Sequence, residues 1–168
     1  MKFTDWFENN LKVGRYPDQD FNYEDYDIII NVSDEFKPEC MMFAYVNKCH
    51  YFWFPMNEKK RDVGLNSIFG ACCILHYAES KNMKVYLQCH AGVNRSQAVK
   101  SAYHYIRTGK HHENEYGGFI NPLLAMSGRG YLPPKAEMEE FLSELSKQLK
   151  EGKYRGLEMI KINTIKNF

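Results

Sequence analysis

The sequence contains no apolar run long enough to span a bilayer, and its first ten residues, MKFTDWFENN, lack the hydrophobic stretch of a signal peptide. We therefore expect a cytoplasmic protein. The sequence also contains no internal repeat, low-complexity tract or obvious linker, and 168 residues can form one domain with its own core. We expect a single domain over residues 1–168, in which residues 150–168 form a basic extension.

The sequence has little net charge, because 22 lysines and arginines face 21 acidic residues. This balance argues against a protein that is held on nucleic acid by bulk electrostatics. Charge is uneven along the chain, however, since residues 1–40 are mainly acidic and residues 147–168 mainly basic. Two solvated faces are the expected consequence. A basic tail that steers an anionic partner is the alternative.

The sequence also lacks the cysteine pattern of a disulfide framework or a zinc site. Its five cysteines are an odd number, and Cys72 and Cys73 are adjacent, which suits neither structure. Reduced thiols are the expected state. The run His111, His112 and Glu113 lies in a polar loop, where solvated side chains are expected, so we predict no metal site.

Short runs rich in branched and aromatic residues are typical of buried strands. We expect such strands at residues 26–32, 41–46, 50–54 and 84–88, the third of them ended by Pro55. Apolar residues at helical spacing predict helices. We expect these at residues 65–80, 95–107, 121–126 and 133–149, with Gly109 as the stop of the second. The alternation favours an α/β fold with a central mixed, mostly parallel sheet flanked by helices.

The most informative segment is VYLQCHAGVNRSQAV, which is predicted to run from a strand through a tight loop into a helix. The loop begins with Cys89 and ends with Arg95, and Ser96 follows. If such a loop wraps around one point, its backbone N–H groups and the positive end of the helix form an anion site of the size of a phosphate. Gly92 allows the turn, and Arg95 offers a planar fork for two phosphate oxygens.

The same positive potential favours an ionised thiol, so we expect Cys89 to be a thiolate. A thiolate beneath a bound phosphate monoester is placed for in-line attack on phosphorus, which gives a phosphocysteine intermediate. Ser96 can donate a hydrogen bond to the sulfur and help it to leave. This chemistry needs no cofactor. The expected substrate-binding residues of the loop are His90, Ala91, Gly92, Val93 and Asn94.

The loop CHAGVNRS resembles the phosphate-binding loop of the protein-tyrosine-phosphatase superfamily, and AGVNRS is most similar to its dual-specificity branch. LKVGRYPDQDF and YDIIINVSDE resemble the opening strands of that fold. GRGYLPPKAEMEEFL resembles a segment in which an arginine precedes a proline-initiated helix. This likeness implies that Arg129 holds the phosphate loop or the substrate, with a surface arginine as the alternative. The resemblance covers Leu11 to about Leu149 and implies a dual-specificity-phosphatase-like fold.

The sequence departs from that family at two positions. The residue before the nucleophile is usually a histidine that tunes the thiol, and here it is Gln88. The family's general acid is an aspartate on a loop upstream of the cysteine, and the usual offset falls on Asn57. Glu58 is one residue away and is the preferred acid, because the leaving oxygen needs a titrating proton donor. Asp62 is the alternative, although it could instead cap the following helix.

The resemblance implies a tyrosine or dual-specificity phosphatase that acts on a phosphorylated protein or peptide. An RNA 5′-phosphatase is one alternative, because Gly-Val-Asn-Arg also resembles the loop of those relatives. A pseudophosphatase that binds phosphorylated partners without turnover is another, favoured by the missing aspartate. A phosphoinositide substrate is disfavoured, because lipid-selective relatives carry lysines within the loop. The sequence leaves the physiological substrate, the preference for tyrosine or serine/threonine and the oligomeric state open.

Overall fold

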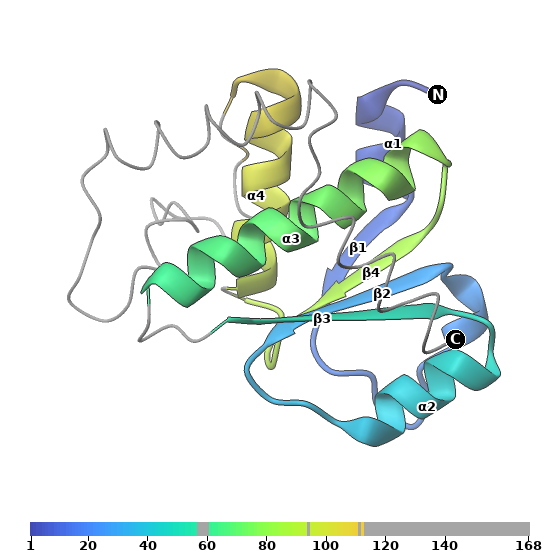
Figure 1. The fold of residues 1–168 in the computed structure, drawn as a ribbon. Coiled ribbons are helices and arrows are strands. Elements are labelled where there is room, and N and C mark those ends of the chain that lie inside the picture. Colours follow the sequence, from blue (N-terminus) through green and yellow to red (C-terminus); the bar gives the residue numbers. More distant parts are fainter. Residues whose placement is uncertain (57–60, 94, 111, 113–168) are drawn as a thin grey trace.

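A computed structural model describes residues 1–56, 61–93, 95–110 and 112, with the backbone alone at 61–66 and 69. These residues form a layered α/β structure in which helices cover both faces of one sheet (Figure 1). The predicted helices at 121–126 and 133–149 and the basic extension at 150–168 lie outside the described residues.

The sheet has four strands in the described part of the chain, ordered β1-β4-β2-β3. They are β1 (Leu11–Gly14), β2 (Ile28–Ser33), β3 (His50–Met56) and β4 (Val85–Gln88). All three strand pairs are parallel. The carboxyl ends of the strands therefore share one edge of the sheet, which is where α/β proteins place their binding sites.

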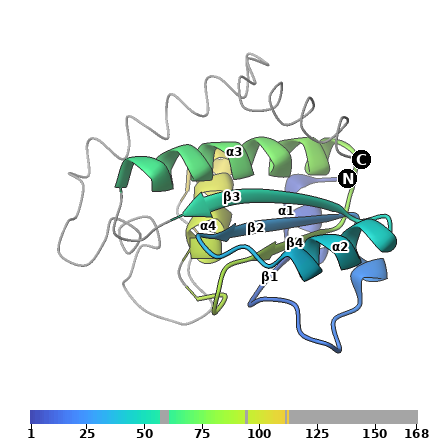
Figure 2. The ribbon, with the colours of Figure 1, turned by 60° about the horizontal axis from the view of Figure 1, so that its bottom comes forward.

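Five helical segments connect and cover these strands: α1 (Phe3–Asn9), η1 (Tyr23–Asp25), α2 (Pro38–Val46), α3 (Arg61–Ser80) and α4 (Arg95–Thr108). Figure 2 shows α3 on one side of the sheet and α2 on the other. Within the described ranges, no helix has both the length and the apolar character needed to cross a bilayer.

Two apolar cores, one on each face, hold the helices to the sheet. Ile28 and Ile30 of β2 point into the larger core, which is formed with α1, α3 and α4. Ile29 points to the other face and packs with Cys40 and Ala44 of α2. Each such buried aliphatic side chain contributes roughly 1.5–3 kcal/mol. Burial on both faces explains why β2 reads as a continuous apolar run and not as an alternating pattern.

The structure confirms most of the elements expected from sequence. Strands occur in the predicted regions 26–32, 50–54 and 84–88, and helices occur at 65–80 and 95–107. The stop after α4 is also confirmed, because Gly109 has φ +71° and donates its N–H to the carbonyl of Tyr105 at 2.7 Å.

The predicted strand at 41–46 is wrong, because this segment belongs to helix α2. Pro38 occupies the first turn, a position that favours a helix start. Only Cys40 and Ala44, four residues apart, are buried, whereas Met42 and Phe43 are 63% and 57% exposed. The exposed apolar residues concealed the helical spacing.

Two further differences lie at element boundaries. Strand β3 continues through Pro55 to Met56, so this proline does not end it. Helix α1 was not predicted. It has only seven residues and buries two of them, Trp6 and Phe7, which is too short a pattern to show helical periodicity.

The structure places the four cysteines other than Cys89 inside the two cores, and all five cysteines are free. Burial raises the pKa of Cys49 and of Cys73 to about 12, so these thiols stay neutral at pH 7. Burial also raises the pKa of Cys40 and, well above its ordinary value, that of Cys72. These four thiols therefore act as small apolar core residues and not as nucleophiles.

Gln88, the last residue of β4, is a buried polar residue in the sheet. Its side chain is fully buried, and neither its amide nitrogen nor its oxygen forms a hydrogen bond within the described part of the chain. Such a group costs about 1–3 kcal/mol. We expect Gln88→Met to raise the free energy of unfolding by about 1 kcal/mol in urea denaturation, whereas Gln88→Glu lowers it. A less stable methionine variant would mean that the amide has a partner.

Candidate active site

The loop between β4 and α4 holds the sulfur of Cys89 between two polar groups. The N–H of Gly92 donates to Sγ at 3.2 Å, and the hydroxyl of Ser96 lies 3.2 Å from Sγ. Cys89 itself is 2% exposed. The sulfur thus lies on the floor of the loop, beside the N-terminus of the 14-residue helix α4. The sulfur therefore faces a backbone N–H, a hydroxyl group and the positive end of a helix dipole.

The shape of this loop depends on a close approach between Gly92 and the end of β1. The N–H of Cys89 donates to the carbonyl of Gly14 at 3.3 Å. Gly92 has φ +74°, and a Cβ atom on it would lie 2.6 Å from the carbonyl carbon of Gly14 and 2.8 Å from the nitrogen of Arg15. Both its backbone conformation and the lack of space therefore require glycine.

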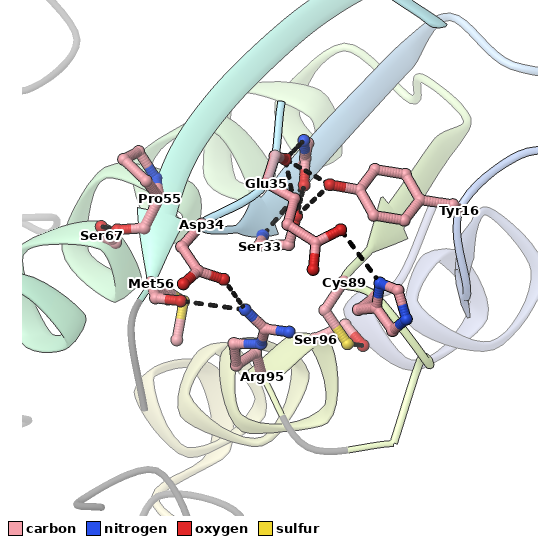
Figure 3. A network of polar contacts seen from close by, with 12 residues as sticks. Tyr16, Ser33, Asp34, Glu35, Pro55, Met56, Ser67, Cys89, Arg95 and Ser96 are labelled. Carbon is pink, nitrogen blue, oxygen red and sulfur yellow. Dashed lines mark hydrogen bonds and ion pairs between the residues drawn. The ribbon is translucent and has the colours of Figure 1, made fainter. Parts of the chain in front are cut away.

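Arg95 is the first residue of α4 and reaches across the loop to two other strand ends. Its Nη1 donates to Oδ1 of Asp34 at 2.6 Å and to the carbonyl of Met56 at 3.1 Å. The side chain of Arg95 is 13% exposed, so these contacts compensate much of the desolvation of a buried cation. In Figure 3 the guanidinium lies between Asp34 and the pair Cys89 and Ser96.

The segment after β2 carries two carboxylates and is held firmly in place. The carbonyl of Glu35 accepts hydrogen bonds from the hydroxyl of Tyr16, from Nδ2 of Asn31 at 3.1 Å and from Oγ of Ser33 at 2.9 Å. The carboxylate of Glu35 lies 3.2 Å from Nδ1 of His90, the residue after Cys89. The network in Figure 3 therefore holds the backbone of Glu35 beside the loop that begins with Cys89.

The structure brings together most of the site residues predicted in the loop itself. Cys89, Gly92 and Ser96 are in direct contact through the sulfur. His90, Ala91 and Val93 are exposed on the loop. Their assignment to substrate binding stays a prediction.

Four predicted site residues are not placed by the described structure. Asn94, Glu58 and Arg129 lie outside it. Asp62 is the second residue of α3, described by its backbone only, so it belongs to the first turn and does not precede the helix as a cap. The proposed roles of these residues in acid catalysis and substrate binding stay predictions.

Sequence reasoning missed three residues of this site, namely Tyr16, Asp34 and Glu35. A signal was present, because the two acids follow directly after a predicted buried strand. In a parallel sheet the carboxyl end of that strand lies beside the carboxyl end of the strand that leads to Cys89. The neighbourhood of the two strands could not be read from the sequence.

The chemistry available here is that of an anion site with a nucleophile beneath it. The loop amide of Gly92, the start of α4 and the guanidinium of Arg95 surround the sulfur with positive potential. The arrangement can hold a tetrahedral oxyanion and present it to Cys89.

The chain is similar in structure to several solved phosphatases. It matches PTPMT1 with a TM-score of 0.53 at 15% identity, over 86% of this chain and 94% of that one. It matches Tk-PTP in the active form with a TM-score of 0.52 at 13% identity, over 84% and 95%. DUSP15 gives a TM-score of 0.51 at 19% identity, over 84% and 91%.

No family model and no curated protein matches the sequence. At these identities the structural likeness establishes the fold. The chain therefore has the fold of tyrosine and dual-specificity phosphatases, as the sequence predicted.

Gly92→Ala tests the shape of the loop. A methyl group at Gly92 would collide with the backbone of Gly14 and Arg15, so we expect affinity for inorganic phosphate, measured by titration calorimetry, to fall at least about tenfold. Gly109→Ala is the matched control. Gly109 also has positive φ, but nothing lies within 4 Å of its added Cβ, so stability falls by about 1 kcal/mol and phosphate affinity is unchanged. Full phosphate affinity in Gly92→Ala would contradict this account of the loop.

Proposed function

We propose that this protein is a cysteine-dependent phosphomonoester hydrolase that acts on a phosphorylated protein or peptide, as a tyrosine or dual-specificity phosphatase. One observation carries the proposal: the sulfur of Cys89 accepts a backbone hydrogen bond from Gly92 and contacts Ser96 at the start of α4, with Arg95 beside it. The fold shared with phosphatases supports the same reaction class.

In the first step the Cys89 thiolate attacks phosphorus and the ester P–O bond breaks. Arg95 and the loop amides hold the non-bridging oxygens, so the charge of the transition state meets donors that are already oriented. The departing oxygen takes up a proton. The sequence assigns that proton to Glu58, with Asp62 as the alternative, and both assignments remain predictions.

In the second step a water attacks the phosphorus of phosphocysteine, the S–P bond breaks and inorganic phosphate leaves. The hydroxyl of Ser96, 3.2 Å from the sulfur, is placed to donate a hydrogen bond to the departing thiolate. A stabilised thiolate is both a better nucleophile at neutral pH and a better leaving group, which serves both halves of the reaction.

The sequence is also compatible with two other functions. A pseudophosphatase would need only the anion site, whereas here a nucleophilic sulfur lies within it, which supports turnover. An RNA 5′-phosphatase must accept several adjacent phosphates. The carboxylates of Asp34 and Glu35 stand at the opening of the loop and would repel them, which supports the peptide substrate.

Cys89→Ser is expected to abolish turnover of p-nitrophenyl phosphate while inorganic phosphate still binds, because the anion site survives without the nucleophile. Cys40→Ser, which changes a thiol of the smaller core, is the matched control and keeps turnover. Turnover by Cys89→Ser would exclude the phosphocysteine mechanism.

Ser96→Ala is expected to slow the second step selectively, since the sulfur would lose a hydrogen bond at the moment it leaves. A stopped-flow trace should then show a burst of p-nitrophenol equal to the enzyme concentration, followed by a slower steady state. A variant without a burst and with an unchanged steady-state rate would show that Ser96 does not assist the leaving sulfur.

The substrate class is tested by comparing a phosphotyrosine peptide and a phosphoserine peptide with a 5′-triphosphorylated RNA. We expect release of phosphate from the peptides. Release from the RNA alone would replace the peptide substrate by the RNA alternative.

A further inference from the structure

The segment after β2 spans the phosphate loop from one end to the other. Asp34 contacts Arg95, which ends the loop, and Glu35 contacts His90, which follows the nucleophile. The sulfur of Cys89 lies buried on the floor between these two contacts. In Figure 3 the carboxylate of Glu35 points into the space between the Asp34–Arg95 pair and Cys89.

This position matters because phosphoryl transfer proceeds in line. The attacking sulfur and the departing oxygen lie on opposite sides of phosphorus. With the sulfur on the floor, the departing oxygen faces the opening of the loop. A group that protonates it must therefore stand at the opening, within hydrogen-bond reach of a bound ester.

We propose that Glu35 is the proton donor to the departing oxygen, with His90 as a positioning residue that orients its carboxyl group. This inference rests on the proposed phosphatase function. As the S–P bond forms and the P–O bond breaks, the proton of the Glu35 carboxyl group passes to the leaving alkoxide or phenoxide. In the second step the Glu35 carboxylate takes a proton from the attacking water, the S–P bond breaks, and the carboxyl group is restored.

Two other polar groups at the opening, Asp34 and Tyr16, are engaged in other contacts. The carboxylate of Asp34 accepts a hydrogen bond from Nη1 of Arg95 at 2.6 Å, so it is engaged in holding the guanidinium. The hydroxyl of Tyr16 is bound to Ser33 and to the carbonyl of Glu35, and burial raises its pKa, which keeps it within that network. Glu35 is half exposed, and its carboxylate lies 3.2 Å from Nδ1 of His90.

A proton donor must be held in a defined position, and hydrogen bonds hold the backbone of Glu35 in this way. Three donors converge on its carbonyl: Tyr16, two residues after β1, Asn31 within β2, and Ser33 at the end of β2. A fixed backbone limits the carboxyl group to side-chain rotation, and positioned acids contribute about 10²–10⁴ in rate. At the position where the family carries its acid, this chain has Asn57, which has no titrating proton.

The experiment compares Glu35→Gln with the wild-type chain on two substrates. Loss of a proton donor slows esters with poor leaving groups, so we expect kcat on a phosphoserine peptide to fall about 10²–10⁴-fold. On an aryl phosphate with a good leaving group the rate of the first step, measured as the burst of released phenol, should fall less than about tenfold, because such a group departs without a proton. Glu39→Gln, an exposed change in the first turn of α2, is the matched control and leaves both rates unchanged.

The pH dependence of kcat distinguishes a proton donor from a residue whose role is only structural. A proton donor gives kcat a basic limb, where the rate falls as the donor loses its proton, and Glu35→Gln should remove that limb. His90→Gln should keep the limb but shift it, since it removes the orienting imidazole. Among the described residues, the charged or titratable groups near Glu35 include Asp34 of the same segment, Arg95 of α4, Cys89, and Tyr16, over whose ring Lys37 lies.

The same rates and pH profiles are measured for three further variants: Glu58→Gln, Asp62→Asn and His90→Gln. The inference is overturned if Glu35→Gln retains the wild-type rate on the phosphoserine peptide, or if one of these three variants removes the basic limb instead. The proposed function fails separately. A wild-type chain that turns over no phosphate ester, or a Cys89→Ser variant that stays active, would overturn that function and this inference together.

Discussion

The parallel register of the sheet is the constraint on which the whole site depends. It brings four strand ends to one edge, and each end supplies one part. The end of β1 supplies the carbonyl of Gly14 that binds the loop, and β3 supplies the carbonyl of Met56 that binds Arg95. Strand β2 leads to Asp34, and β4 leads to Cys89. A shift of any strand by one residue would separate these groups, because successive side chains alternate between the two faces.

The positive charge of Arg95 links the strand ends that carry Asp34 and Met56. A cation that is mostly withdrawn from water is costly unless it is paired. Asp34 and the carbonyl of Met56 provide that pairing, so the guanidinium is held before any substrate arrives. Preorganisation of this kind reduces the conformational entropy that would be lost when a substrate binds. The same ion pair places the negative charge of Asp34 near the anion site that we propose, which would weaken the attraction of that site for substrates with many phosphates.

The sequence predicted the parts of the site that are contiguous in the chain. The strand, loop and helix around Cys89 obey local rules, because a loop of fixed length followed by a helix start makes an anion site wherever it occurs. The contacts that cross the sheet could not be predicted in the same way. Asp34 lies 61 residues before Arg95, and Glu35 lies 55 residues before His90. Their meeting depends on the strand order, which no local pattern contains. The strand predicted at 41–46 was wrong for a related reason. Whether a helical or a strand spacing can be recognised depends on which side chains are buried, and the residue types alone do not show this.

The strand order also bears on where an acid can stand in such a fold. Strands β2 and β3 are parallel neighbours, so their carboxyl ends lie side by side, about 4.8 Å apart, at the same edge of the sheet. An acid that follows β2 and an acid that follows β3 therefore approach the same opening from adjacent directions. In-line chemistry fixes the line through sulfur, phosphorus and departing oxygen, but it leaves the direction of proton delivery around that line free. The fold can thus exchange one strand end for the next as the origin of its acid without moving the nucleophile. Glu35, which we propose as the donor, follows β2, whereas Glu58, the donor predicted from the sequence, comes after β3 in the chain.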